Sequence, residues 1–280
     1  MNSDSYFCIG SSHKYCEDYA IHGDLSDNDK TLSYALISDG CSSSLVSKGI
    51  RNPINVDIGN RLIALEIKNE ISSIFKNFND DVREKWINIF LQNLNNTNLY
   101  EVLLKNKIDD QIFDCTVLLS IVLGDKIYIR ILGDGVIAVK NKSGILDILN
   151  LEYDNNAPMY YSYLMNKVRL DKFEEVSKLK ITRTSISDSI ELKEEYECKT
   201  NDIIIKYNTD EISSISLFSD GVKTFRDKEG KEINYIEIVK QLTDFKNKNG
   251  EFVKKQLNIF NRNNKELLHS DDFSFSAIII

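Results

Sequence analysis

The amino-acid sequence predicts an α+β fold in which antiparallel sheets are covered by layers of helices. Blocks typical of strands and blocks with apolar residues three and four apart, typical of helices, follow one another in the order β, α, long β, α, β. The alternating βα units that build a parallel sheet do not occur in this pattern. Short turns separate successive runs of the long β block, and such hairpins produce antiparallel sheets.

The amino-terminal part of the chain is predicted to contain three strands and then helices. Apolar clusters indicate strands at 6–9, 18–21 and 32–37. From about residue 57 the period changes, and one face of a helix is defined by Ile63, Ile67, Ile71, Ile74 and Phe78. The same spacing predicts a second helix through Val82, Trp86, Ile89 and Phe90. A third, weaker helix is expected around 100–104, after a polar connection at 92–98.

The carboxyl-terminal part is predicted to be mainly strand, with one pair of helices. Strand character returns at Thr116 and holds almost to Phe218, with runs rich in Val, Ile and Leu at 117–123, 126–132 and 136–140. One helix is predicted through Ile238, Val239, Leu242 and Phe245, and the next through Val253, Leu257 and Phe260. A last strand is predicted at 273–280. With only 2 Pro and 12 Gly there is little material for a flexible tether, so we expect a single domain over 1–280.

Composition and charge exclude several classes of protein. Of 280 residues, 42% are hydrophobic and 28% charged, a globular balance that argues against a disordered chain or a fibre. The 43 acidic against 35 basic side chains make a nucleic acid an unfavourable partner and suit a protein that collects cations. No apolar run is long enough to span a membrane or to serve as a signal peptide. We therefore expect a cytoplasmic protein whose five cysteines are reduced thiols.

The chemistry is predicted to depend on carboxylates, since motifs for other chemistries are absent. There is no phosphate loop, no HExxH, no GxSxG and no paired zinc-type cysteines, and the three histidines are scattered. Asp-Gly follows an apolar run three times, at Asp39, Asp134 and Asp220. A hairpin turn is an adequate explanation at Asp134, because a new strand begins at once. The other two lead into irregular segments, where functional sites are commonly built.

Two further acidic pairs stand at comparable places, Glu17-Asp18 before an early strand and Asp271-Asp272 before the last one. Each alone is most simply a solvated charge at the edge of a strand. If the strands are neighbours, however, bare carboxylates would raise one another's pKa values, and divalent cations would remove that repulsion. Ligation by oxygen alone favours Mg²⁺ or Mn²⁺ over Zn²⁺.

The order of these clusters resembles that of the type 2C, metal-dependent (PPM) protein phosphatases, particularly their compact bacterial branch. Together the matching stretches span nearly the whole chain, and they are 10–20, 38–44, 57–61, 132–135, 156–158, 218–221 and 271–274. The resemblance implies a four-layer α-β-β-α sandwich, with two antiparallel sheets flanked by helices and a two-metal site at one end.

The resemblance also implies roles for individual residues. Asp39 corresponds to the carboxylate that bridges two Mg²⁺ or Mn²⁺ ions, helped by the Gly40 carbonyl, and Asp220 and Asp271 correspond to ligands of one metal. Asp18 corresponds to a carboxylate that binds a metal or supports a ligand. Further expected site residues, which would support the ligands, hold a weakly bound third metal or contact phosphate, are Glu17, Asp134, Asp272, His13 and Lys14.

The implied function is removal of phosphate from phosphoserine or phosphothreonine of proteins by a metal-activated water. Two departures from the family pattern favour an alternative, a catalytically weak or inactive module that binds phosphorylated partners. Cys41 stands where many relatives have histidine, and Thr224 stands where relatives often have a carboxylate. Asp114 in the segment 114–116 has no explanation from the sequence. The same chemistry on a small phosphorylated metabolite also fits the sequence, and the oligomeric state is left open.

Overall fold

Two antiparallel sheets form the centre of the protein. The computed structural model describes residues 1–27, 30–41, 44–47, 50–53, 56–78, 80–94, 105, 109–154, 157–187, 190–198, 200–201 and 203–280. The larger sheet has seven strands, in the order β1 (Asn2–Cys8), β16 (Phe273–Ile279), β13 (Ile212–Phe218), β8 (Gly135–Asn141), β9 (Leu146–Tyr153), β10 (Leu179–Ser187) and β11 (Ile190–Glu197). The smaller has five, in the order β12 (Ile203–Asn208), β7 (Lys126–Leu132), β6 (Val117–Leu123), β3 (Lys30–Ser38) and β2 (Tyr19–Asp27).

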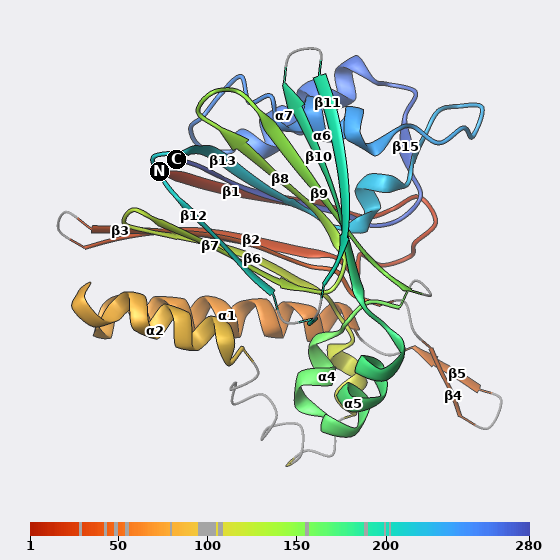
Figure 1. Cartoon of the computed structure of the whole chain (residues 1–280). Coiled ribbons are helices and arrows are strands. Elements are labelled where there is room, and N and C mark those ends of the chain that lie inside the picture. The colour runs from red at the N-terminus through yellow and green to blue at the C-terminus, as the bar shows by residue number, and fades with distance from the viewer. Residues whose placement is uncertain are drawn as a thin grey trace.

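A pair of helices lies against the outer side of each sheet (Figure 1). Helices α1 (Val56–Asn77) and α2 (Asp80–Gln92) cover the five-stranded sheet, where α1 contacts β2 and β3. Helices α6 (Tyr235–Thr243) and α7 (Phe252–Asn263) cover the seven-stranded sheet, where α6 contacts β9 and α7 contacts β1 and β16. The predicted α+β class with antiparallel sheets is therefore confirmed.

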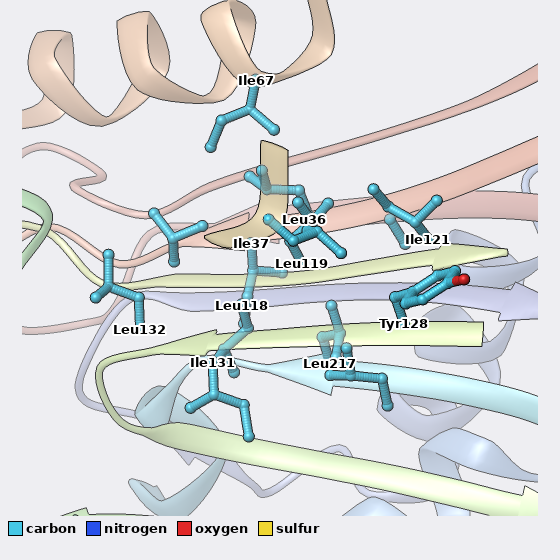
Figure 2. Packing of buried hydrophobic residues seen from close by; sticks show 14 of the residues in the cluster. Leu36, Ile37, Ile67, Leu118, Leu119, Ile121, Tyr128, Ile131, Leu132 and Leu217 are labelled. Atoms are coloured by element: carbon cyan, nitrogen blue, oxygen red, sulfur yellow. The ribbon is translucent and has the colours of Figure 1, made fainter. Parts of the chain in front are cut away.

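The apolar core fills the spaces between these elements. One cluster joins α1 to both sheets, and Figure 2 shows Ile67 of α1 above Leu118 of β6, with Leu217 of β13 beyond. Strand β6 is buried along almost its whole length because one of its faces meets α1 and the other meets the opposite sheet. A second cluster lies between the seven-stranded sheet and α6 and α7, and includes Phe218 and Phe275.

The structure corrects one part of the sequence interpretation. Strand character does not hold from Thr116 to Phe218, because α4 (Tyr161–Met165) and α5 (Lys167–Val176) interrupt it. Both helices are short, and α5 buries only Phe173, so the apolar period that predicts a helix is nearly absent. The helix expected around 100–104 lies outside the described residues.

The remaining elements are small. A two-stranded ribbon is formed by β4 (Ser44–Ser47) and β5 (Ile50–Pro53), and another by β14 (Phe225–Arg226) and β15 (Leu268–His269). Two 3₁₀ turns, η1 (Asp110–Phe113) and η3 (Asp220–Lys223), stand beside strand ends. Among the helices in the described ranges, none has the length and apolarity needed to cross a bilayer.

Candidate active site

Carboxylates from separate parts of the chain meet at one end of the two sheets. Asp39 follows β3, Asp134 lies between β7 and β8, Asp220 follows β13, and Asp271 precedes β16. These four side chains help to line a cavity of about 350 Å³, whose other lining residues are His13, Gly40, Cys41, Thr116, Pro158 and Tyr160. The cavity wall is thus built from loops that leave or enter buried strands, which give them a rigid support.

The Asp39-Gly40 pair is positioned by the backbone of three segments. The Asp39 carbonyl accepts a hydrogen bond from the Thr116 amide (2.8 Å), and Gly40 forms a bridge with Cys115. The Gly40 amide donates to the Glu17 carbonyl (3.2 Å). A Cβ atom on Gly40 would stand 2.7 Å from that carbonyl oxygen, closer than any side chain could approach. Glycine here lets the strand end pack against the amino-terminal loop.

The Asp220-Gly221 pair begins η3 and packs against the start of β16. A Cβ on Gly221 would lie 1.8 Å from the Asp272 carbonyl oxygen, so only glycine permits this approach. Thr224 joins the same two segments. Its Oγ1 donates to the Gly221 carbonyl (2.9 Å) and accepts from the Asp271 amide (3.2 Å). The residue that departs from the family pattern therefore has a structural role, which brings Asp220 and Asp271 together.

Asp18 lies behind Asp39 rather than in the cavity wall. Its side chain is buried and hydrogen-bonded to the Ser219 hydroxyl and to Asp39, and its Oδ2 lacks a geometrically well-placed partner in the described part of the chain. Burial raises the pKa of Asp18 to about 7, and the charge of Asp220 adds to this effect.

The other cavity carboxyls are perturbed for the same reasons. Burial, and then the charges of Asp18 and Asp220, hold the pKa of Asp39 well above its usual range. Burial and the charge of Asp220 raise the pKa of Asp134 to about 7, and they also raise that of Asp271. Raised pKa values at Asp39, Asp134 and Asp271 in the cavity wall, and at Asp18 behind it, indicate a site that favours positive charge.

Asp272 faces away from the cavity and holds the amino-terminal loop. Its carboxylate accepts hydrogen bonds from the amides of Gly10 (2.7 Å) and Glu17 (2.5 Å). His13 lies between the two acidic residues, with Nε2 3.3 Å from Asp271 Oδ1 and Nδ1 3.1 Å from Asp272 Oδ2. Although burial lowers the pKa of His13, its close contact with the Asp272 carboxylate and the charges of Asp271 and Glu17 raise it overall.

The structure does not bring every expected residue into the cavity. Glu17 contributes its carbonyl, which accepts from Gly40 and from the Asn60 side chain, and its side chain does not line the cavity. Lys14 is exposed, with Nζ 5.2 Å from the centre of the Tyr15 ring, and does not line it either.

The sequence did not point to two uncharged residues of the cavity wall. Tyr160 and Thr116 line the cavity, and Tyr160 hydrogen-bonds to Cys41. Burial, and then this bond to Cys41, raise the pKa of Tyr160. The only signal in the sequence was the position of Tyr160 shortly after the segment 156–158, of which Asn156 lies outside the described residues.

An ion pair between Asp114 and Arg169 supports the part of the cavity wall that includes Tyr160. Arg169 Nη2 donates to both carboxylate oxygens of Asp114 (2.8 and 3.0 Å), and Ser162 Oγ donates to the same carboxylate. The Arg169 guanidinium also lies 4.7 Å from the Tyr163 ring centre, and Tyr163 packs edge-on against Tyr160. Asp114, which the sequence left unexplained, thus binds Ser162 of α4 and Arg169 of α5 and holds these helices beside the cavity.

The donor set has the chemistry that a hard cation requires. The cavity offers carboxylate oxygens and the Gly40 carbonyl, and Asp18 has an oxygen without a well-placed partner in the described residues. Within those residues, no three His, Cys, Asp or Glu side chains are arranged so that they could hold an ion between them. Instead Asp39 is hydrogen-bonded to Asp18 and Asp220. Such carboxyl pairs share protons, and a cation could take the place of those protons.

Comparison with known proteins decides the family. The profile described as "Protein phosphatase 2C" matches residues 10–260. The chain belongs to this family. No curated protein sequence matches the chain.

Solved structures with a similar fold include bacterial serine and serine/threonine phosphatases. A point mutant of a bacterial serine phosphatase matches with a TM-score of 0.54 at 14% identity, covering 100% of this chain and 98% of that one. The serine/threonine phosphatase Stp1 from Staphylococcus aureus matches with a TM-score of 0.50 at 14% identity, over 100% and 94%. The S. agalactiae serine/threonine phosphatase matches with a TM-score of 0.50 at 12% identity, over 100% and 99%. At these identities the likeness shows only that the fold is shared.

Proposed function

We propose that this member of the protein phosphatase 2C family is a Mg²⁺- or Mn²⁺-dependent hydrolase that removes phosphate from phosphoserine and phosphothreonine in proteins. The observation that carries the proposal is the convergence of Asp39, Asp134, Asp220 and Asp271 on one cavity from four separate strand ends. Similar structures described as serine/threonine phosphatases support the substrate class.

The ligand set that we propose for two ions is Asp39, Asp220, Asp271 and the Gly40 carbonyl. Asp18 would hold Asp39 from behind, because it is buried and hydrogen-bonded to it. Asp134, which lines the same cavity and is affected by the charge of Asp220, would support the ligands or hold a weak third ion. When bound, such a pair of hard cations screens the charge of a phosphate group and activates a water for attack on phosphorus.

The remaining polar residues would position substrate and restrain the ligands. We assign the phosphate contact to His13, because it lines the cavity whereas Lys14 does not. Its pKa is raised by Asp272 and Asp271 after burial has lowered it, so it can carry a positive charge towards an anion. Asp272 would act only through the loop 10–17, whose amides it binds. Pro158 and Tyr160 form an uncharged wall, against which the body that carries the phosphate would rest.

The test is Mn²⁺-dependent hydrolysis of an aryl phosphate and of phosphopeptides by the purified chain. Asp39→Asn and Asp220→Asn should each lower kcat by about 100-fold or more, since each removes charge at the reacting centre. Asp125→Asn is the matched control, because that side chain is 81% exposed and outside the cavity. Full activity in the first two variants would overturn the site. Faster hydrolysis of sugar phosphates or nucleotides than of phosphopeptides would replace the substrate class.

A second candidate is a phosphatase 2C domain that binds phosphorylated partners with little turnover. Cys41 in the cavity wall favours it, since a thiol hydrogen-bonded to Tyr160 is a poorer proton donor than histidine. Calorimetry with Mn²⁺ separates the two candidates. Binding of metal and phosphopeptide without release of phosphate would favour the binding module.

The partner that we propose is a phosphorylated protein, met in the cytoplasm by a single domain over 1–280. The acidic balance of the chain, net −8, supports a partner other than a nucleic acid. Fractionation of cells followed by detection of the protein would test the compartment.

A further inference from the structure

The outermost strand of the seven-stranded sheet is unusually open. In the described part of the chain, β11 pairs only with β10, and all eight of its residues are exposed. Figure 1 shows β11 at the margin of the sheet. Its outer backbone amides and carbonyls therefore offer a row of hydrogen-bonding groups to another strand.

The unequal size of the two sheets explains this exposure. Where the sheets face each other, β1 contacts β2, β16 contacts β3, and β13 contacts β6. Counted from that side, the five-stranded sheet ends before the seven-stranded sheet does, and β11, at the far end of the larger sheet, extends beyond the covered region.

The core-side face of β11 carries apolar side chains without cover. Tyr196 lies opposite Ile181, which is buried in the core, so this is the face that points towards the interior. Glu194 shares it with the apolar residues Ile190, Leu192 and Tyr196. They are nonetheless 61%, 63% and 46% exposed. Large apolar groups that alternate along an open edge are typical of a strand that receives a peptide.

The opposite face of β11 is acidic. Glu191, Glu195 and Glu197 alternate with a single lysine, Lys193, and Glu191 lies opposite Ile186, which packs against the outer apolar cluster. A strand added beside β11 would therefore meet mainly apolar groups, with Glu194 among them, on one face and mainly carboxylates on the other. Two of those carboxylates, Glu195 and Glu197, lie 3.1 and 3.5 Å from the ammonium groups of Lys193 and Lys178 at exposed positions.

We propose that β11 is a docking edge for an extended peptide in which lysine or arginine alternates with apolar residues. The peptide would add an eighth strand to the sheet, with its basic side chains beside the glutamates and its apolar side chains beside Leu192 and Tyr196. Opposite charges across a strand pair are favourable, and the backbone bonds supply affinity. The proposal does not depend on the cavity or on the proposed phosphatase activity.

A second copy of this chain is a poorer occupant. If two copies of the chain paired through β11 as antiparallel strands, related by a two-fold axis normal to the sheet, two registers would each pair seven residues of one copy with the same seven of the other. One places Lys193 opposite Lys193 and Glu191 opposite Glu195. The other places Glu194 opposite Glu194 and Glu191 opposite Glu197, and sets Lys193 opposite Glu195. Like charges directly opposite each other destabilise a strand pair, so the charge pattern favours a basic partner.

The probe is an eight-residue labelled peptide of alternating lysine and valine, added to the full chain and followed by fluorescence anisotropy. Hydrogen exchange of the chain with and without peptide locates the contact. We expect binding that slows exchange of β11 amides and that is lost when alternate peptide nitrogens are methylated, because N-methylation removes the backbone donors.

Variants of the chain test the charge pattern. The double variant Glu191→Lys/Glu195→Lys should bind the lysine–valine peptide about tenfold more weakly and should bind a glutamate–valine peptide instead. Glu174→Lys/Glu175→Lys on α5 is the matched control, with the same change of net charge at exposed positions, and should bind as the parent does. Equal binding by all three chains would overturn the proposal. So would protection away from β11, or dimerisation of the parent chain that the β11 variant abolishes.

Discussion

Removal of the Arg169 guanidinium should destabilise the protein by breaking its link to Asp114. In the structure Arg169 donates two hydrogen bonds to that carboxylate, whose side chain is only 8% exposed. Arg169→Met keeps the length of the side chain and its packing against Tyr163 but removes the charge. The Asp114 carboxylate would keep only its bond from Ser162 and would be left buried without a cation.

The size of the effect follows from burial. Breaking a fully buried ion pair costs about 3–5 kcal/mol, because one charge remains uncompensated. The Arg169 side chain is 24% exposed, so water already screens part of the pair, and we expect about 2–3 kcal/mol at neutral pH. For a domain of 280 residues that loss lowers Tm by about 3–5 °C.

The pH dependence of this loss gives a second signature. Burial raises the pKa of Asp114 even though Ser162 and Arg169 lower it. Without Arg169 the pKa rises further, so the native variant retains a proton that the unfolded chain has released. The free energy of unfolding of the variant should therefore fall as pH increases above the unfolded pKa, and the deficit should be smaller near pH 5 than near pH 8.

The assay is urea unfolding followed by circular dichroism, with Arg183→Met as the matched control. Arg183 binds Asp147 at 2.7 Å, but its side chain is 43% exposed, so its removal should cost less than about 1 kcal/mol. If Arg169→Met unfolds with the free energy of the parent or of Arg183→Met, the anchoring role of the Asp114 pair is refuted.

Three further predictions test the fold and the site. Deletion of 277–280 should abolish cooperative unfolding, because β16 pairs on both sides with β1 and β13; an unchanged melting curve would contradict this. Gly221→Ala places a Cβ against the Asp272 carbonyl, so it should cost about 1–3 kcal/mol and lower phosphatase activity; parental stability and activity would show that the contact is dispensable. Burial raises the pKa values of Asp18 and Asp134 to about 7 each, so without divalent cations the native state holds more protons than the unfolded chain, and the free energy of unfolding should fall from about pH 5 to pH 8. Urea unfolding at each pH measures this, and added Mn²⁺ should reverse the fall. A free energy of unfolding that does not change with pH in the absence of metal would argue against carboxyls held protonated by burial.

The sequence pointed to some cavity residues and not to others, because it does not show the direction in which each side chain points. Asp39 and Asp220 stood out because each ends a buried strand and leads into irregular chain. Asp134 had the pattern of an ordinary hairpin turn, and only the neighbouring strands show that its side chain lines the cavity. Tyr160 had no signal except its position shortly after 156–158, since its placement depends on α4 and α5, which Arg169 holds through a contact distant in sequence.

By itself, the sequence determined the order of the strand and helix blocks, the antiparallel class and the family resemblance. These follow from local periodicity and from short motifs that every chain segment carries within itself. The tertiary structure alone decided which carboxylates share a cavity, what Asp114 binds and why β11 is uncovered. Each of these depends on which strands become neighbours and how far one sheet extends past the other, and neither property is encoded in any single stretch of residues.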